Sequence, residues 1–132
     1  MEIKTKSKLD EFILCHLTPE GDLLDLEDKN ITPEHLRLLC QAGATLRNVK
    51  QLYLSNNGLG NSEVEFLSKS RCLSNLEKLF LNHNKISDAG AKILAESKLV
   101  SNINCLMLEA NNIGAEGAKA LANSSNLKNL KT

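Results

Sequence analysis

Short hydrophobic runs recur along the chain, each followed by polar residues and then by apolar residues at helical spacing. Four runs superimpose: LLDLEDKNIT from Leu23, QLYLSNNGLG from Gln51, KLFLNHNKIS from Lys78 and CLMLEANNIG from Cys105. They share the frame Leu-x-Leu-x-x-Asn-x-(Ile/Leu), which starts at Leu24, Leu52, Leu79 and Leu106, in steps of 28, 27 and 27 residues. Alternate side chains of a strand point to opposite faces, so each run predicts a strand with its leucines on one buried face.

Each predicted strand leads into a predicted helix. The residues after the four frames are types favoured at a helix N-cap, namely Thr32, Gly60, Ser87 and Gly114. Helical spacing then places one inward stripe at Leu36 and Leu39, Val64 and Leu67, Ala91 and Leu94, and Ala118 and Leu121. Small residues predict close approach of the later helices to the sheet, at Ala91, Ala95, Ala118 and Ala122. Such a strand-helix unit cannot bury its apolar face alone, so stacked neighbours must supply the core.

Asparagines occupy two further columns of the repeat. One column precedes an aliphatic residue that lies three positions before a leucine, at Asn48, Asn75, Asn102 and Asn126. It predicts that a fifth repeat begins at Leu127 and Leu130. The other column lies where each strand turns away, at Asn57, Asn84 and Asn111. An amide there can bond backbone groups that a tight turn leaves unpaired. Lys29 holds this place in the first repeat, which predicts a degenerate terminal repeat with no preceding neighbour to bond.

The segments NLEKLFLNHNKISDAGAKILAES and NINCLMLEANNIGAEGAKALANS resemble the leucine-rich repeat, specifically its ribonuclease-inhibitor-like subfamily. The resemblance covers roughly residues 21–132. It implies an α/β leucine-rich-repeat solenoid, a short curved horseshoe with a parallel β-sheet on the concave face and α-helices on the convex face. Proteins of this kind include ribonuclease inhibitors, sensor domains of nucleotide-binding receptors, activators of the Ran GTPase and proteins that bacterial pathogens deliver into host cells. The resemblance therefore implies a binding protein.

The ends of the chain differ from the repeats between them. Residues 1–20 predict an N-terminal capping helix, and residues 21–132 four repeats plus the start of a fifth. The cap is indicated by apolar residues at helical spacing before Pro19, namely Leu9, Phe12, Ile13 and Leu17. The C-terminal NLKNLKT begins a strand without a covering helix, so unpaired backbone groups are expected at an open edge. Two alternatives stay open: the chain is part of a longer array, or the edge pairs with another molecule, including a second copy.

Charge and length narrow the classes of partner. The 132 residues are enough for one domain, and 16 basic residues balance 16 acidic ones. No broad field exists to attract nucleic acid or a membrane surface. Asp10, Glu11 and His16 interrupt any signal-peptide apolar region. A cytoplasmic location is the expectation, with delivery into a host cell by a specialised secretion system left open.

The four cysteines do not form a metal-binding or disulfide pattern. Cys15, Cys40, Cys72 and Cys105 lie 25, 32 and 33 residues apart, without a short ligand pair. We expect reduced thiols that serve as small buried apolar side chains, and neither a metal site nor a cofactor.

The column between the two strand leucines holds the candidate binding site. It contains Tyr53, Phe80 and Met107, which would form a row about 10 Å long on the concave sheet, with Asp25 at its end. Aromatic and methionine side chains on a rigid exposed surface are typical interface anchors. Neighbouring columns would supply a polar border, for which we select Gln51, Lys78, Asn82, His83 and Glu109. The alternative is that an exposed sheet simply carries residues that favour strands.

Other candidate chemistry is weaker. The acidic cluster Glu20, Asp22, Asp25, Glu27 and Asp28 is either a site for a basic partner or a solvated surface, and the second interpretation is favoured. His83 and Cys105 cannot form a catalytic pair, because their columns differ by five positions, about 16 Å. The sequence thus favours a non-catalytic protein-binding module, such as a sensor or a pathogen effector. The alternatives are a regulator of a GTPase, for which Arg37, Arg47 and Arg71 are badly placed, and a purely structural repeat segment.

Overall fold

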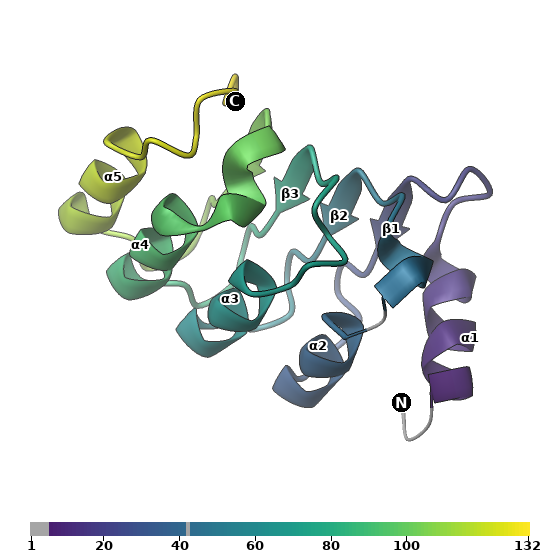
Figure 1. The fold of residues 1–132 in the computed structure, drawn as a ribbon. Helices are drawn as coiled ribbons and strands as arrows, with labels where there is room; N and C mark the ends of the chain where they lie inside the picture. Colours follow the sequence, from purple (N-terminus) through teal and green to yellow (C-terminus); the bar gives the residue numbers. More distant parts are fainter. Residues whose placement is uncertain (1–5, 42) are drawn as a thin grey trace.

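Four short parallel strands and a row of helices form two layers in the computed structural model, which describes residues 6–41 and 43–132. The strands are β1 (Leu23–Asp25), β2 (Gln51–Tyr53), β3 (Lys78–Phe80) and β4 (Cys105–Met107), in the order β1-β2-β3-β4. The helices that follow them lie side by side along one face of the sheet (Figure 1): α2 (Pro33–Leu39), α3 (Asn61–Ser68), α4 (Asp88–Glu96) and α5 (Ala115–Ala122). Two 3₁₀ helices lead toward strands, η1 (Gly43–Leu46) toward β2 and η2 (Lys98–Asn102) toward β4. The predicted α/β repeat architecture is confirmed.

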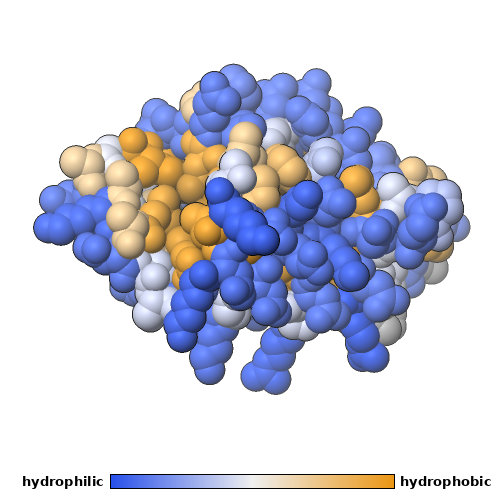
Figure 2. Space-filling view, turned by 90° about the horizontal axis from the view of Figure 1, so that it is seen from above, coloured by the Kyte–Doolittle hydropathy of each residue, from blue (hydrophilic) through white to orange (hydrophobic). Residues whose placement is uncertain are grey.

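The register of the sheet follows the leucine frame. Leu24 pairs with Leu52, Leu52 with Leu79, and Leu79 with Leu106. The first three are at most 3% exposed, whereas Leu106 is half-buried. No full strand lies on the outer side of β4 in the described part of the chain, so Leu106 packs against the core from one side only. Hydrophobic atoms accordingly gather on the α5 side of the molecule, toward the left of Figure 2.

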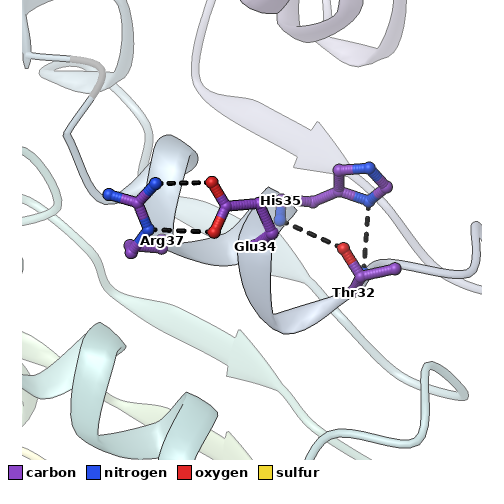
Figure 3. A network of polar contacts seen from close by, with 4 residues as sticks. All are labelled: Thr32, Glu34, His35 and Arg37. Carbon is purple, nitrogen blue, oxygen red and sulfur yellow. Dashed lines mark hydrogen bonds and ion pairs between the residues drawn. The ribbon is translucent and has the colours of Figure 1, made fainter. Parts of the chain in front are cut away.

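The predicted helix starts are confirmed, because Thr32, Gly60, Ser87 and Gly114 are the N-cap residues of α2 to α5. The Thr32 hydroxyl accepts the His35 N–H at 3.2 Å, and His35 Nδ1 accepts the Thr32 N–H at 3.2 Å (Figure 3). Two of the later caps are made across repeats instead. Asn61 Oδ1 accepts the Ser87 N–H at 3.0 Å, and Asp88 Oδ1 accepts the Gly114 and Gly117 N–H groups at 2.6 and 3.0 Å. The first residue of one helix therefore caps the next helix.

The predicted inward stripe holds in α2, α3 and α4 and only in part in α5, where Leu121 is half-buried against the core. Leu36, Leu39, Val64, Leu67, Ala91 and Leu94 are buried as expected. Ala118 and Ala122 are exposed, so their placement on a packed face was wrong. Ala118 of α5 is equivalent to Ala91 of α4. Helix α4 has α5 packed beside it, whereas no further helix packs beside α5 in the described residues.

Ala91 and Ala95, two of the small residues predicted to face the sheet, are buried. Close approach between neighbouring helices occurs at two glycines. A Cβ at Gly90 would lie 2.4 Å from Asn61 Oδ1 and 2.7 Å from Ile86 Cγ2. A Cβ at Gly117 would lie 2.7 Å from Asp88 Oδ1. A side chain at either place would displace the groups that cap across repeats, which explains glycine at the same position of two helices despite its poor helix propensity.

The turn asparagines form a ladder between repeats. Asn84 Nδ2 donates to Leu54 O at 3.1 Å in the preceding repeat and to Leu81 O at 3.0 Å in its own. Asn84 Oδ1 accepts the N–H groups of Asn57 and Leu59, both at 3.0 Å. Asn57 makes the same contacts one repeat earlier, to Leu26 O and to the N–H groups of Lys29 and Ile31. Because these bonds point backward, Lys29 in the first repeat has no earlier repeat to bind.

The fifth repeat starts three residues later than the sequence pattern predicted. Asn75, Asn102 and Asn129 donate from Nδ2 to the carbonyls of Arg47, Ser74 and Ser101 respectively, so Asn129, not Asn126, belongs to this column. Lys131 N–H then donates to Asn104 O, as Asn104 N–H does to Glu77 O. Leu130 is therefore the counterpart of Ile103, and the assignment of Leu127 to that place was wrong. The segment NLKNL repeats Asn-Leu every three residues, which made two frames equally good.

Helix α1 (Lys6–His16) stands beside β1 at the opposite end from α5 (Figure 1). Leu9 and Ile13 are buried, and Leu17 forms an antiparallel bridge with Leu24. This contact covers the outer edge of β1. Residues 1–5 of the predicted cap lie outside the described residues, and the domain boundary at residue 20 stays a prediction.

Replacing Asn84 by alanine is expected to lower the free energy of unfolding by about 3 kcal/mol, because the N–H groups of Asn57 and Leu59 lose their acceptor in a buried turn. Urea unfolding followed by circular dichroism measures the change. Asn112→Ala is the matched control, since this side chain is exposed, and its effect is expected to stay within about 0.5 kcal/mol. Equal effects of the two substitutions would contradict the ladder's role.

Candidate functional site

The predicted anchor residues lie in one row on the open sheet face, the face turned away from α2 to α5. Tyr53 pairs in register with Phe80, and Phe80 with Met107. Asp25 pairs with Tyr53 and ends the row at β1. These side chains alternate with the buried leucines of each strand, so they project to the opposite face. The structure thus brings together the four residues of this column.

The two aromatic rings of the row pack against each other. Their centroids are 4.3 Å apart and their planes meet at 62°, an edge-to-face arrangement. Tyr53, Phe80 and Met107 are half-buried, and Asp25 is exposed. The ring contact holds Tyr53 and Phe80 in place before any partner arrives, which lowers the conformational entropy lost on binding.

Part of the expected polar border is engaged in the sheet. Ser55 is buried, and its hydroxyl accepts the Asn82 N–H at 3.0 Å. Asn82 Oδ1 in turn accepts the Glu109 N–H at 2.8 Å. Asp25 Oδ1 accepts the Glu27 N–H at 3.1 Å. Asn82 and Asp25 therefore have local structural roles, whereas the side chain of Glu109 is exposed beside the row.

His83 occupies a column of left-handed backbone. Its φ is 54°, and the equivalent residues Asp28, Asn56 and Ala110 have φ values of 53°, 59° and 58°. Asn, Asp and His are the non-glycine residues that tolerate this region best. The left-handed backbone thus accounts for Asp, Asn or His at this position of the first three repeats. His83 lies exposed at the border of the row.

The sheet register places His83 and Cys105 too far apart to act as a catalytic pair. Cys105 pairs with Lys78, five positions before His83 along the strand, as the sequence predicted. At about 3.3 Å per residue this offset separates the two side chains far beyond hydrogen-bond reach.

The cysteines are less buried than expected. Cys15 is exposed and the other three are half-buried, so the prediction of four buried apolar thiols was wrong. Cys15 is an exposed residue of α1. Ser70 Oγ lies 3.1 Å from Cys72 Sγ and donates to the backbone carbonyl of Cys40 at 3.5 Å, and the Cys72 thiol donates to the same carbonyl at 3.5 Å. Burial and the neighbouring Cys72 raise the pKa of Cys40 to about 12.

Within residues 6–41 and 43–132, no group of three or more His, Cys, Asp or Glu side chains could hold a metal ion. None of the helices in the same ranges is long and apolar enough to cross a membrane.

Arg37 is hydrogen-bonded to Glu34 on α2, where its Nε donates to Glu34 Oε2 at 3.0 Å (Figure 3). This hydrogen bond lowers the pKa of Glu34.

Two comparisons bear on the family. The sequence family described as Leucine Rich repeat matches residues 72–95 and 101–122, which span the third and fourth strands with the helices that follow them. These two segments are leucine-rich repeats, and the described chain has the fold of a leucine-rich-repeat solenoid. A search of curated protein sequences finds no match. The narrower assignment to the ribonuclease-inhibitor-like subfamily stays a prediction.

Solved structures resemble this leucine-rich-repeat chain over almost its whole length. The tropomodulin C-terminal domain from Caenorhabditis elegans superimposes with a TM-score of 0.61 at 13% identity, covering 96% of this chain and 93% of that one. The structure of Leiomodin-1 Actin-Binding Site 2 superimposes with a TM-score of 0.64 at 17% identity, covering 98% of this chain and 76% of that one. At these identities the likeness shows the fold alone.

The leucine frame did not point to a second surface feature of the leucine-rich-repeat protein, a groove lined by residues immediately before the strands. Asp22, Lys50 and Glu77 line it in successive repeats. The sequence signal that could have revealed this groove is the charged residue at the same position of successive repeats, which is independent of the hydrophobic pattern.

Replacing Ala110 by asparagine is expected to stabilise the leucine-rich-repeat protein by about 1 kcal/mol, because alanine is strained at a φ of 58° and asparagine is not. Thermal unfolding measures the gain. Ala110→Val is the opposite control and is expected to lower stability, because a β-branched side chain tolerates this backbone least. A lower melting temperature for Ala110→Asn would contradict the left-handed assignment.

Alkylation is expected to distinguish Cys40 from Cys15. With a pKa of about 12, Cys40 holds almost no thiolate at pH 8, so iodoacetamide should label exposed Cys15 first. Mass spectrometry of tryptic peptides measures both sites, and all four cysteines should react in guanidinium. Folding raises this pKa from 9.0, so the neutral thiol stabilises the fold at lower pH, and that stability should be lost as the pH rises from about 9 toward 12. Equal labelling rates in the folded state would contradict the assignment.

Proposed function

We propose that this chain is a non-catalytic module that binds another protein through the open sheet face. The row Tyr53–Phe80–Met107 carries the proposal. Single exposed apolar residues are common on protein surfaces, whereas three aligned on adjacent strands with packed rings form a continuous apolar centre. The strands fix the spacing of the row, so a partner meets a rigid surface.

The border of the row supports a protein partner over a small ligand. Gln51 and Lys78 flank it on the side of the strand starts, and Asn82, His83 and Glu109 on the side of the strand ends. Asp25 adds an exposed carboxylate at one end. An apolar centre with a polar and mixed-charge rim is the usual arrangement of a protein interface.

Protein binding also agrees with the likeness to the leiomodin domain, which is named an actin-binding site. The likeness to it does not carry a partner over to this chain. The narrower roles of sensor and pathogen effector, the GTPase-regulating alternative and self-association through the edge of β4 all stay predictions. The open sheet face favours none of them over the others.

Replacing Tyr53, Phe80 and Met107 together by alanine is expected to weaken partner binding by at least about tenfold, because each anchor of an interface centre contributes on the order of 1 kcal/mol or more. The partner is first identified by affinity purification with the unmodified chain and mass spectrometry. Its affinity for the triple variant is then measured by biolayer interferometry.

Leu14→Ala is the matched control for that measurement, since Leu14 is a large apolar side chain, 62% exposed, on α1 away from the row. Its affinity should equal that of the unmodified chain. Unchanged binding by the triple variant, with an unchanged circular dichroism spectrum, would overturn the proposal.

A further inference from the structure

A groove of about 930 Å³ runs along the amino ends of the strands, beside the open sheet face but separate from its apolar row. Its charged lining changes sign from one end to the other. Glu20 and Asp22 line the end next to β1, and Lys128 and Lys131 line the end beyond β4. Lys50 and Glu77 lie between them.

The backbone fixes the length of the groove. Asp22, Lys50, Glu77, Asn104 and Lys131 occupy one position of successive repeats. The backbone N–H of each of the last four residues donates to the carbonyl of the residue one repeat earlier in this series, at 2.7, 2.7, 2.8 and 2.8 Å. Four strand spacings of about 4.8 Å place the two charged ends roughly 19 Å apart.

The charges at the two ends are not neutralised within the molecule. Lys50 Nζ and Glu77 Oε2 are 4.0 Å apart and balance each other in the middle. Within residues 6–41 and 43–132, no ion pair involves Glu20, Asp22, Lys128 or Lys131. Asp22 Oδ1 accepts the Thr18 hydroxyl at 3.0 Å, which holds this carboxylate in place without cancelling its charge.

The wall of the groove offers regularly spaced acceptors. Asn75, Asn102 and Asn129 line it, and each amide uses Nδ2 to donate to a carbonyl of the preceding repeat. That bond orients the amide and leaves Oδ1 available. In the described part of the chain these oxygens accept no hydrogen bond, so they can receive backbone N–H groups from a bound chain.

We propose that this groove binds an extended polypeptide segment with a cationic side chain at one end and an anionic side chain about six residues away, the number that spans roughly 19 Å. The cation lies against Glu20 and Asp22, and the anion against Lys128 and Lys131. A nucleic acid carries one sign of charge along its length, so the acidic end of the groove opposes it. The surface is distinct from the apolar row, and the two sites can be tested separately.

Two fluorescein-labelled nonapeptides of serine, glutamine and threonine test the proposal. One carries arginine near one end and glutamate six residues later, and the other has the same composition with arginine and glutamate adjacent. Fluorescence anisotropy at low ionic strength should show tighter binding of the separated peptide to the full chain. Raising the salt to about 0.3 M should weaken that binding, because exposed charges are then screened within a few ångströms.

Lys128→Glu with Lys131→Glu is expected to weaken binding of the separated peptide at least about fivefold. The matched control is Lys92→Glu with Lys119→Glu, which makes the same change of net charge on exposed positions of α4 and α5 and should have little effect. A third peptide with arginines at both ends should regain affinity for the Lys128→Glu, Lys131→Glu chain.

Equal affinities for the separated and adjacent peptides would overturn the proposal, as would equal losses in the two double variants. Circular dichroism checks that each variant is folded. The alanine variant of Tyr53, Phe80 and Met107 should bind the separated peptide unchanged, so failure of the groove is distinguishable from failure of the apolar row.

Discussion

The asparagine ladder is the interaction on which the stacking of this molecule depends. Each turn amide satisfies carbonyls in two repeats and the N–H groups of the preceding turn, as Asn84 does for Leu54, Leu81, Asn57 and Leu59. A three-residue strand has too few ladder bonds to fix its neighbour alone. The amide extends the pairing into the turn, where backbone groups would otherwise be buried without partners. Removing one amide therefore weakens the contact between two repeats as well as one turn.

This repeat-to-repeat bonding sets the spacing of everything on the surface. Because each repeat is held to the next at the same backbone positions, side chains 27 or 28 residues apart become neighbours about 4.8 Å apart. Tyr53, Phe80 and Met107 form a row for that reason, and so does the column from Asp22 to Lys131. The leucines make the stack stable, and the residues between them are left to determine what it binds.

Sequence periodicity predicted the strands, the helix starts and the candidate row, because each depends on residues within one repeat. The periodicity gave wrong or incomplete predictions where the environment of a residue is set by a neighbouring repeat. Ala118 is exposed because no helix packs on the far side of α5 in the described residues. Gly90 and Gly117 are required by side chains of the preceding helix, Asn61 and Asp88. The fifth repeat was misplaced because Asn126 and Asn129 fit the local pattern equally, and only bonds to the fourth repeat distinguish them.

The two proposed surfaces are close but physically separate. Lys50 and Tyr53, or Glu77 and Phe80, are three residues apart, which is about 10 Å along a strand. The column between them holds Gln51, Lys78 and Cys105, all half-buried. At that separation, substitutions in the groove and in the apolar row share no direct contact, so their effects on binding should be nearly additive. A partner broad enough to cover both would lose affinity when either surface is substituted, whereas two separate partners would each respond to one surface only. The pattern of losses therefore shows whether one partner or two use this side of the sheet.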